Sequence, residues 1–191
     1  MTVLENLLND GTLELFKTKL LHSTTTTTRT TTTTTTDLDS SIAPPIYVDF
    51  GLSDGKDTKF HLSKGYSTVS VDDAYAPWID KAKNEFQQEI KDGRALFFII
   101  RVSTKDEDSM NFYFKNEGSV IASFEPSKGC QGFKVTSPKC KHIKIPVVRC
   151  EAILALIGMA ATFVKVDVEM LHHSCVRGLG DLPTYLLPKI I

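Results

Sequence analysis

The chain has 191 residues, 41% hydrophobic and 24% charged, a composition typical of a globular protein with a single core of useful size. Its 22 basic and 23 acidic residues give a formal net charge of −1, which gives no support to a nucleic-acid or anionic-membrane surface. No apolar run is long enough to span a bilayer, so we expect no transmembrane segment. The oligomeric state has no signature in the sequence.

The four cysteines are widely spaced and form no C-x-x-C motif; they are Cys130, Cys140, Cys150 and Cys175. Disulfide frameworks belong mainly to short secreted chains, so we expect reduced thiols in a cytoplasmic protein. A zinc site built from Cys130, Cys140, His142 and Cys150 matches no compact knuckle spacing, and we expect no metal.

The N-terminal region divides into a helical segment and a threonine tract. Residues 1–22 carry apolar side chains at mostly helical spacing, interrupted at Gly11. A helix packed on the domain is favoured over a partner-binding or membrane-surface helix, because the segment is short and its charge is mixed. Residues 23–41 are predicted to be a disordered linker, since threonines bury too little surface to offset their ordering entropy. Residues 42–191 form the predicted folded domain.

From residue 46 onward, apolar runs alternate with helix-like segments. Strands are expected at 46–50, 67–71, 95–102, 143–149 and 162–169, a hairpin at 110–114 and 119–124, a loop at 125–141, and helices at about 57–64, 76–90, 151–157 and 171–179. One more strand is expected to begin within 183–191. This alternation predicts an α/β fold with a mostly parallel, doubly wound sheet.

A glycine-containing turn follows the first predicted strand. Asp72 lies 21 positions after Gly51 (72 minus 51), close to the spacing between a glycine turn and a ribose-binding acid. Ser53 stands where the nicotinamide fingerprint has its second glycine, which weighs against an NAD-linked oxidoreductase. Asp49 brings negative charge to the turn and favours a cationic ligand such as S-adenosylmethionine. Gly51 or Gly55 alone is more typical of an ordinary turn, but the glycines, the acid and the strand together favour cofactor binding.

The strand predicted at 162–169 carries three charges on one face, namely Lys165, Asp167 and Glu169. Such charges are either solvated at a sheet edge or paired in a cleft, and the strand's C-terminal end favours the cleft. A carboxylate there would act as general base toward a hydroxyl, with Lys165 holding it ionised. Ser103 follows the third strand, near the expected position of an adenine ring, although loop polarity explains it as well.

Five stretches then occur in order: YVDFGLSDGKDTKFHLSKGYSTVSVDD (47–73), MNFYFKNEGSVIASFEP (110–126), KIPVVRCEAILALIG (144–158), FVKVDVEMLHHSCVRGL (163–179) and LPTYLLPKI (182–190). Together they resemble the FkbM-type S-adenosylmethionine-dependent methyltransferases, which methylate mostly hydroxyl oxygens of small molecules and sugars. The resemblance spans about residues 46–191 and leaves residues 1–41 outside.

The resemblance implies a Rossmann-like class I methyltransferase fold. It assigns cofactor binding to the first strand, its turn and the end of the second strand: Asp49, Gly51, Gly55, and Asp72 or its competitor Asp73. Ser53, within the same turn, is also predicted to bind the cofactor. It also matches the family's K-x-D-x-E strand to Lys165, Asp167 and Glu169, the implied catalytic residues.

The sequence departs from the family in two places. Met170 stands where the family has glycine, and the family domain continues through a final strand pair where this sequence ends at Ile191. The sheet is therefore expected to lack its final strand or strands, with an exposed edge unless the N-terminal helix covers it. We predict an O-methyltransferase for a small-molecule or carbohydrate acceptor, whole or as a fragment. The alternative is a catalytically inactive module of the same fold that binds a ligand or partner.

Overall fold

The computed structural model describes residues 11–22, 43–72, 76–104, 109–115, 122–168 and 171–191, and the account below concerns these residues. The predicted linker, Asp73, Glu169 and Met170 lie outside them.

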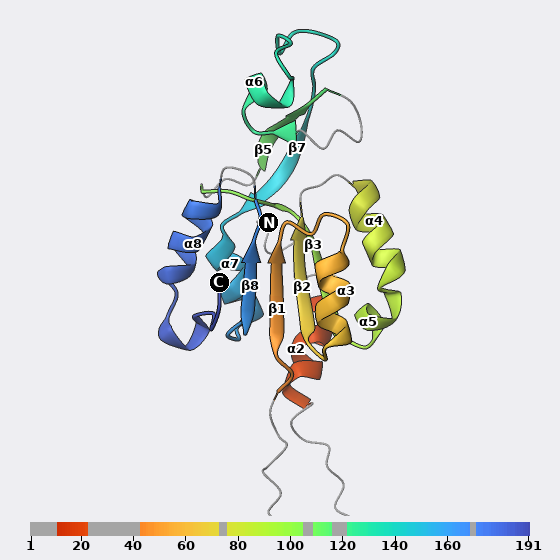
Figure 1. Cartoon of the computed structure of the whole chain (residues 1–191), viewed down its shortest axis with the longest axis vertical. Helices are drawn as coiled ribbons and strands as arrows, with labels where there is room; N and C mark the ends of the chain where they lie inside the picture. The colour runs from red at the N-terminus through yellow and green to blue at the C-terminus, as the bar shows by residue number, and fades with distance from the viewer. Residues whose placement is uncertain (1–10, 23–42, 73–75, 105–108, 116–121, 169–170) are drawn as a thin grey trace, which may run out of the picture.

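Strands and helices alternate along most of the chain (Figure 1). The elements are α2 (Thr12–His22), β1 (Ile46–Phe50), α3 (Lys56–Ser63), β2 (Ser67–Asp72), α4 (Ala76–Glu85), α5 (Gln87–Lys91), β3 (Ala95–Ile99), β4 (Arg101–Val102), β5 (Ser109–Phe114), β6 (Ala122–Ser123), α6 (Pro126–Gly129), β7 (Lys141–Val148), α7 (Cys150–Ile157), β8 (Phe163–Val166), α8 (His172–Gly180) and the 3-10 turn η1 (Thr184–Leu186). None of the described helices is long and apolar enough to cross a membrane.

The central sheet has four strands in the order β3-β2-β1-β8, and every neighbouring pair is parallel. A second sheet has the order β4-β7-β5-β6, in which β4 and β7 are parallel and the other pairs antiparallel. The predicted α/β class with a mostly parallel sheet is therefore confirmed, and the arrangement is consistent with a Rossmann-like fold.

Helices cover both faces of the central sheet, because alternate strand residues point to opposite sides. One face packs its valines, leucine and phenylalanines against α2, α7 and α8 in the main core. The other face packs Phe97 and Ala95 against Leu62 of α3 and Phe86 in a smaller core. Figure 1 shows α7 and α8 on one side of the strands and α3, α4 and α5 on the other.

The N-terminal helix α2 belongs to the main core, which agrees with the favoured interpretation of this segment. Its apolar side chains Leu13, Phe16 and Leu20 are fully buried, and the helix packs beside β3. Since β3 and β8 are opposite edges of the central sheet, α2 does not cover the β8 edge.

Several predicted elements differ from the structure. The strand predicted at 95–102 divides into β3 and β4, which belong to different sheets, and the strand predicted at 162–169 ends at Val166. The helix predicted at 76–90 breaks into α4 and α5 at Phe86, whose buried ring stacks on Phe97 at 5.7 Å. The predicted hairpin exists as β5 and β6, but β5 pairs along its whole length with β7, and the predicted loop before β7 contains α6. Residues 183–191 form η1 and one bridge from Ile190 to Phe163, not the start of a full strand.

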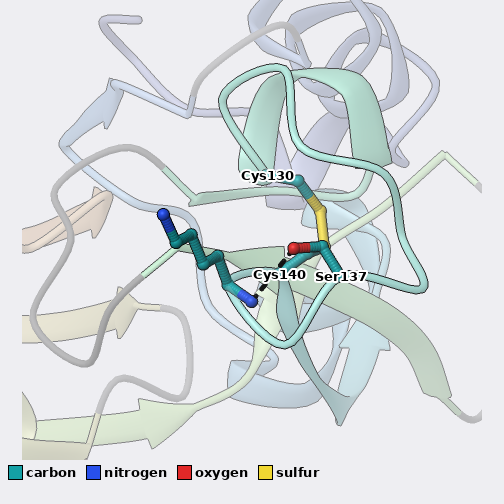
Figure 2. The surroundings of a disulfide bond; sticks show 4 residues. Cys130, Ser137 and Cys140 are labelled. Atoms are coloured by element: carbon teal, nitrogen blue, oxygen red, sulfur yellow. Dashed lines mark hydrogen bonds between the residues drawn. A yellow bond between two sulfur atoms is a disulfide. The ribbon is translucent and has the colours of Figure 1, made fainter.

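The prediction of reduced thiols is wrong. The structure pairs Cys130 with Cys140 and Cys150 with Cys175, and Figure 2 shows the first pair. The pairings use the cysteines of the considered zinc site, so that alternative is contradicted as well. The spacing of the cysteines in the sequence does not predict these pairs, because the partners of the second pair lie 25 residues apart and meet only when α7 packs against α8.

The Cys150–Cys175 bond closes a 25-residue loop between two core helices. In the chain-entropy treatment, closing a loop of this length lowers the conformational entropy of the unfolded chain and raises its free energy by roughly 3 kcal/mol. We expect the double variant Cys150→Ser, Cys175→Ser to lose about that much free energy of unfolding, measured by urea denaturation. The matched variant Cys130→Ser, Cys140→Ser opens a 10-residue loop outside the main core, so its loss should be smaller. Equal losses would contradict this account.

Candidate functional site

The turn after β1 brings the chain close to the end of β2. Gly51 N–H donates to the Val71 carbonyl at 2.9 Å, and Ser53 N–H donates to Asp72 Oδ2 at 2.8 Å. Gly51, Ser53 and Gly55 have positive φ angles of 104°, 51° and 75°. The turn is therefore built from the residues that the sequence predicted, with Asp72 fastening it from the neighbouring strand.

Gly51 is required because the segment after β8 crosses it closely. A Cβ atom built on Gly51 would lie 2.3 Å from the Asp167 carbonyl oxygen. The approach is fixed by a hydrogen bond of 2.8 Å from Asp167 N–H to the Phe50 carbonyl. The predicted glycine turn and the predicted charged strand thus meet at one place.

Asp49 is a fully buried acid at the centre of this place. Neither of its carboxylate oxygens accepts a hydrogen bond from the described residues, and its nearest cation is Lys165 Nζ, 3.3 Å from Oδ1. Burial raises the pKa of Asp49 to about 7, with Lys165 opposing the rise and the charges of Asp57 and Asp72 adding to it. The site therefore holds a carboxylate that lacks full solvation and favours an added cation or hydrogen-bond donor.

Lys165 connects the acids of the site. Its Nζ lies 2.9 Å from Asp57 Oδ2, 3.9 Å from Asp167 Oδ2 and 3.3 Å from the Gly51 carbonyl oxygen. Burial lowers the pKa of Lys165, but the hydrogen bond to Asp57 and the charges of Asp49 and Asp57 outweigh it, so the pKa is raised. Lys165 is therefore a fixed cation within an acidic group.

Both interpretations of the charged strand hold in part. Among the described strands, β8 is the end strand of its sheet, with a single bridge to Ile190 on its outer side. Yet Lys165 lies directly opposite Asp49 in the β1–β8 register and is ion-paired. Asp167 remains open to solvent, with 76% of its side chain exposed.

Asp72 lies at the C-terminal end of β2, as expected for a ligand-binding acid. Burial raises its pKa, whereas hydrogen bonds from the Ser53 and Leu52 backbone and the charge of Arg101 act against the rise. One carboxylate oxygen of Asp72 is thus already engaged by the turn, so a ligand would share this group with the backbone.

Ser103 lies outside the site formed by the turn after β1, Asp49 and Lys165. Its N–H donates to the Val148 carbonyl at 2.8 Å, and its side chain lines a cavity of about 170 Å³ beside Arg149, Glu151 and Arg177 of the α7–α8 region. This cavity is bounded by the main-core helices, whereas Asp49 faces α3. Its place near an adenine ring stays a prediction.

Asp57, which the sequence analysis did not single out, belongs to the site. It lies in the first turn of α3 and makes the shortest ion pair with Lys165. Acids in the first turn of a helix are common because they complement the helix dipole, so the sequence alone gave it no special weight. Its position two residues after Gly55, where the turn becomes a helix, is the signal that would have found it.

A buried hydroxyl pair, Thr58 and Ser70, joins α3 to β2 behind the turn, with 2.9 Å between the two oxygens. We expect Ser70→Ala to lower the free energy of unfolding by about 1–2 kcal/mol, because the Thr58 hydroxyl then stays buried without this partner. The double variant Thr58→Val, Ser70→Ala should recover part of that loss. Thermal and urea unfolding of the wild type, Ser70→Ala and the double variant measure this; a double variant no more stable than Ser70→Ala would contradict it.

Comparison of the chain with known proteins gives no match. No family model, curated protein or solved structure matches it. Any assignment of function therefore rests on the motifs and on the geometry of the site.

Proposed function

We propose that the chain is an S-adenosylmethionine-dependent methyltransferase of Rossmann-like class I fold that methylates a hydroxyl of a small molecule or carbohydrate. The observation that carries the proposal is the buried carboxylate of Asp49, which lies at a glycine turn and accepts no hydrogen bond from the described residues. A cation would stabilise its ionised form. The amino and sulfonium groups of this cofactor are cationic, so the residues fit them.

Each part of the turn has a role in this proposal. Asp49 and Asp57 would hold the amino group, Gly51 would let the segment of Asp167 lie against the turn, and Asp72 would accept from ribose hydroxyls. Glu169 and Asp73, which the resemblance also assigns, lie outside the described residues. The cofactor, when bound, supplies an electrophilic methyl group on sulfur.

The chain's own contribution to the reaction is mainly positioning. Asp167 is exposed beside Lys165 and would accept the proton of the acceptor hydroxyl at a carboxylate oxygen. Lys165, held by Asp49 and Asp57, lies 3.9 Å from that carboxylate and would orient it.

One observation favours the alternative of a non-catalytic binding module. The Lys165 ammonium already lies against Asp49 and Asp57, so a cationic ligand has to displace it or share these carboxylates. Such a site could retain a ligand without passing a methyl group on.

A methyl-transfer assay tests the proposal. We expect transfer of labelled methyl from S-adenosylmethionine to at least one acceptor in a panel of sugars, acidic oligosaccharides, polyols and phenols. Asp167→Asn should lower the rate about a hundredfold, as for loss of a general base, while binding of S-adenosylhomocysteine is kept. Binding without transfer to any acceptor would favour the module, and absence of binding would remove the proposal.

The predicted cytoplasmic location rested partly on reduced thiols. The two disulfides remove that basis, because disulfides persist mainly in oxidising compartments. We propose an oxidising environment for the folded chain, which protection of all four thiols from alkylation in freshly isolated protein would test.

A further inference from the structure

A basic lobe projects beyond the central sheet. We define it as residues 109–115 and 122–144, from β5 through the exposed half of β7; Figure 1 shows β5, α6 and β7 at the end of the molecule toward which β1 and β2 point. These residues include six lysines, no arginine and one glutamate, in a chain whose net charge is −1. The lobe is therefore positive while the rest of the chain is negative.

Most of this charge is not neutralised within the described part of the lobe. Glu125 pairs with Lys128 at 2.7 Å. No carboxylate of the described residues forms an ion pair with Lys115, Lys134, Lys139 or Lys144. These four ammonium groups are available to an external anion.

Two of these lysines share one aromatic ring. Lys115 Nζ and Lys139 Nζ lie 5.4 Å and 5.2 Å from the centre of the Phe133 ring. The ring attracts each cation and so holds both lysines near one place on the lobe. The Phe133 ring therefore gathers two lysines from separate segments, one after β5 and one before β7.

The Cys130–Cys140 disulfide fixes the segment that carries Lys139. The Lys139 N–H donates to the Ser137 hydroxyl at 3.2 Å. Figure 2 shows Ser137 beside this disulfide. Next along the chain, β7 exposes Lys144 opposite Asn111 and His142 opposite Tyr113, whose rings lie 5.6 Å apart. Cationic, amide and aromatic groups thus line one face of the β5–β7 pair.

We propose that the basic lobe is a docking surface for an anionic oligosaccharide, a sugar chain with sulfate or carboxylate groups. The choice of a carbohydrate rests on the proposed hydroxyl methylation. The acids Asp49, Asp57, Asp72 and Asp167 repel an anionic acceptor from the site itself, so such an acceptor needs a separate cationic anchor. The lobe offers that anchor beyond the ends of the strands that carry the site.

Two features favour a sugar chain over a nucleic acid. Phe133 has lysine ammonium groups over it, so it is a poor platform for a stacked base. The lobe also lacks arginine, the residue whose planar fork recognises phosphate in two-point contacts.

The test is equilibrium binding of the intact, oxidised chain to a heparin-derived sulfated oligosaccharide, a polygalacturonate oligosaccharide and an uncharged oligosaccharide of equal length. We expect binding of one or both anionic sugars, weakened by salt, and at least tenfold weaker binding to the uncharged one. The double variant Lys115→Gln, Lys139→Gln should reduce the affinity at least tenfold. Lys144→Glu is a second variant, outside the Phe133 contact, with the same expected direction.

The matched control is Lys64→Gln, Lys91→Gln, which removes two exposed lysines outside the lobe, one of them also over an aromatic ring. Its affinity should stay unchanged. Equal loss in the control, equal binding of the uncharged sugar, or tighter binding of single-stranded RNA would each overturn the proposal. Sugar binding is measured without cofactor, so its outcome is independent of the methyl-transfer assay. Failure of the lobe proposal and failure of the proposed function can therefore be distinguished.

Discussion

Replacing Asp49 with asparagine should stabilise the folded chain at neutral and higher pH and at the same time remove cofactor binding. Asp49 is fully buried, and its pKa is raised from an ordinary 3.8 to about 7. Well below pH 3.8 the side chain is protonated in both folded and unfolded states, so the two proteins should be similarly stable there. As the pH rises to about 7, the unfolded state ionises first, and the folded wild type loses stability.

The size of this effect follows from the pKa difference. Fully expressed, it amounts to about 4 kcal/mol, and we expect about 2–4 kcal/mol because the asparagine amide also needs hydrogen bonds. Urea unfolding at pH 4, 6 and 8 should show a gap that opens with pH. Asp54→Asn, at an exposed acid in the same turn paired with Lys56, is the control and should show no such gap. A gap that is constant with pH would contradict the assignment.

Replacing Gly51 with alanine should have the largest destabilising effect of any single methyl group in the site. The Cβ would lie 2.3 Å from the Asp167 carbonyl oxygen, and the φ of 104° is one that side chains rarely adopt. Backbone strain and overpacking together should cost about 4 kcal/mol. The turn would also move away from β8, so cofactor binding should be lost.

The variant Gly65→Ala separates the effect of backbone strain from the effect of steric overlap. Gly65 also has a positive φ, 84°, but nothing lies within 4 Å of a Cβ built there. This control should lose about 1–2 kcal/mol from the left-handed backbone alone. Urea denaturation of both variants measures the difference, and the account fails if Gly51→Ala is no less stable than Gly65→Ala.

Sequence patterns predicted the elements around the site because those patterns are local. The apolar run of β1, the glycine turn and the first turn of α3 were placed to within a residue or two. Alternation also predicted Lys165 and Asp167 on one face, but β8 ends at Val166 and Asp167 follows it. In a parallel sheet, the ends of neighbouring strands meet, so the approach of Asp49 and Lys165 could be anticipated in outline.

Contacts between distant segments could not be predicted in the same way. The β5 strand pairs fully with β7, which lies beyond β6 and α6, because burial of Phe112 against Ile145 and Val147 favours that pairing. The Cys150–Cys175 bond depends on the packing of α7 against α8. Neither proximity has a local signature, and the same holds for the hydrogen bond from Ser53 to Asp72.

Titration of the intact, oxidised chain with S-adenosylhomocysteine is the most direct test of the central claim that the Asp49 turn binds the methyl donor. Calorimetry should show one site, with proton release near pH 7, because a cationic amino group favours the ionised form of Asp49, whose pKa is about 7. Asp49→Asn should lose both the binding and the proton release. Absence of binding by the folded wild type, or binding of NADH in its place, would contradict the account.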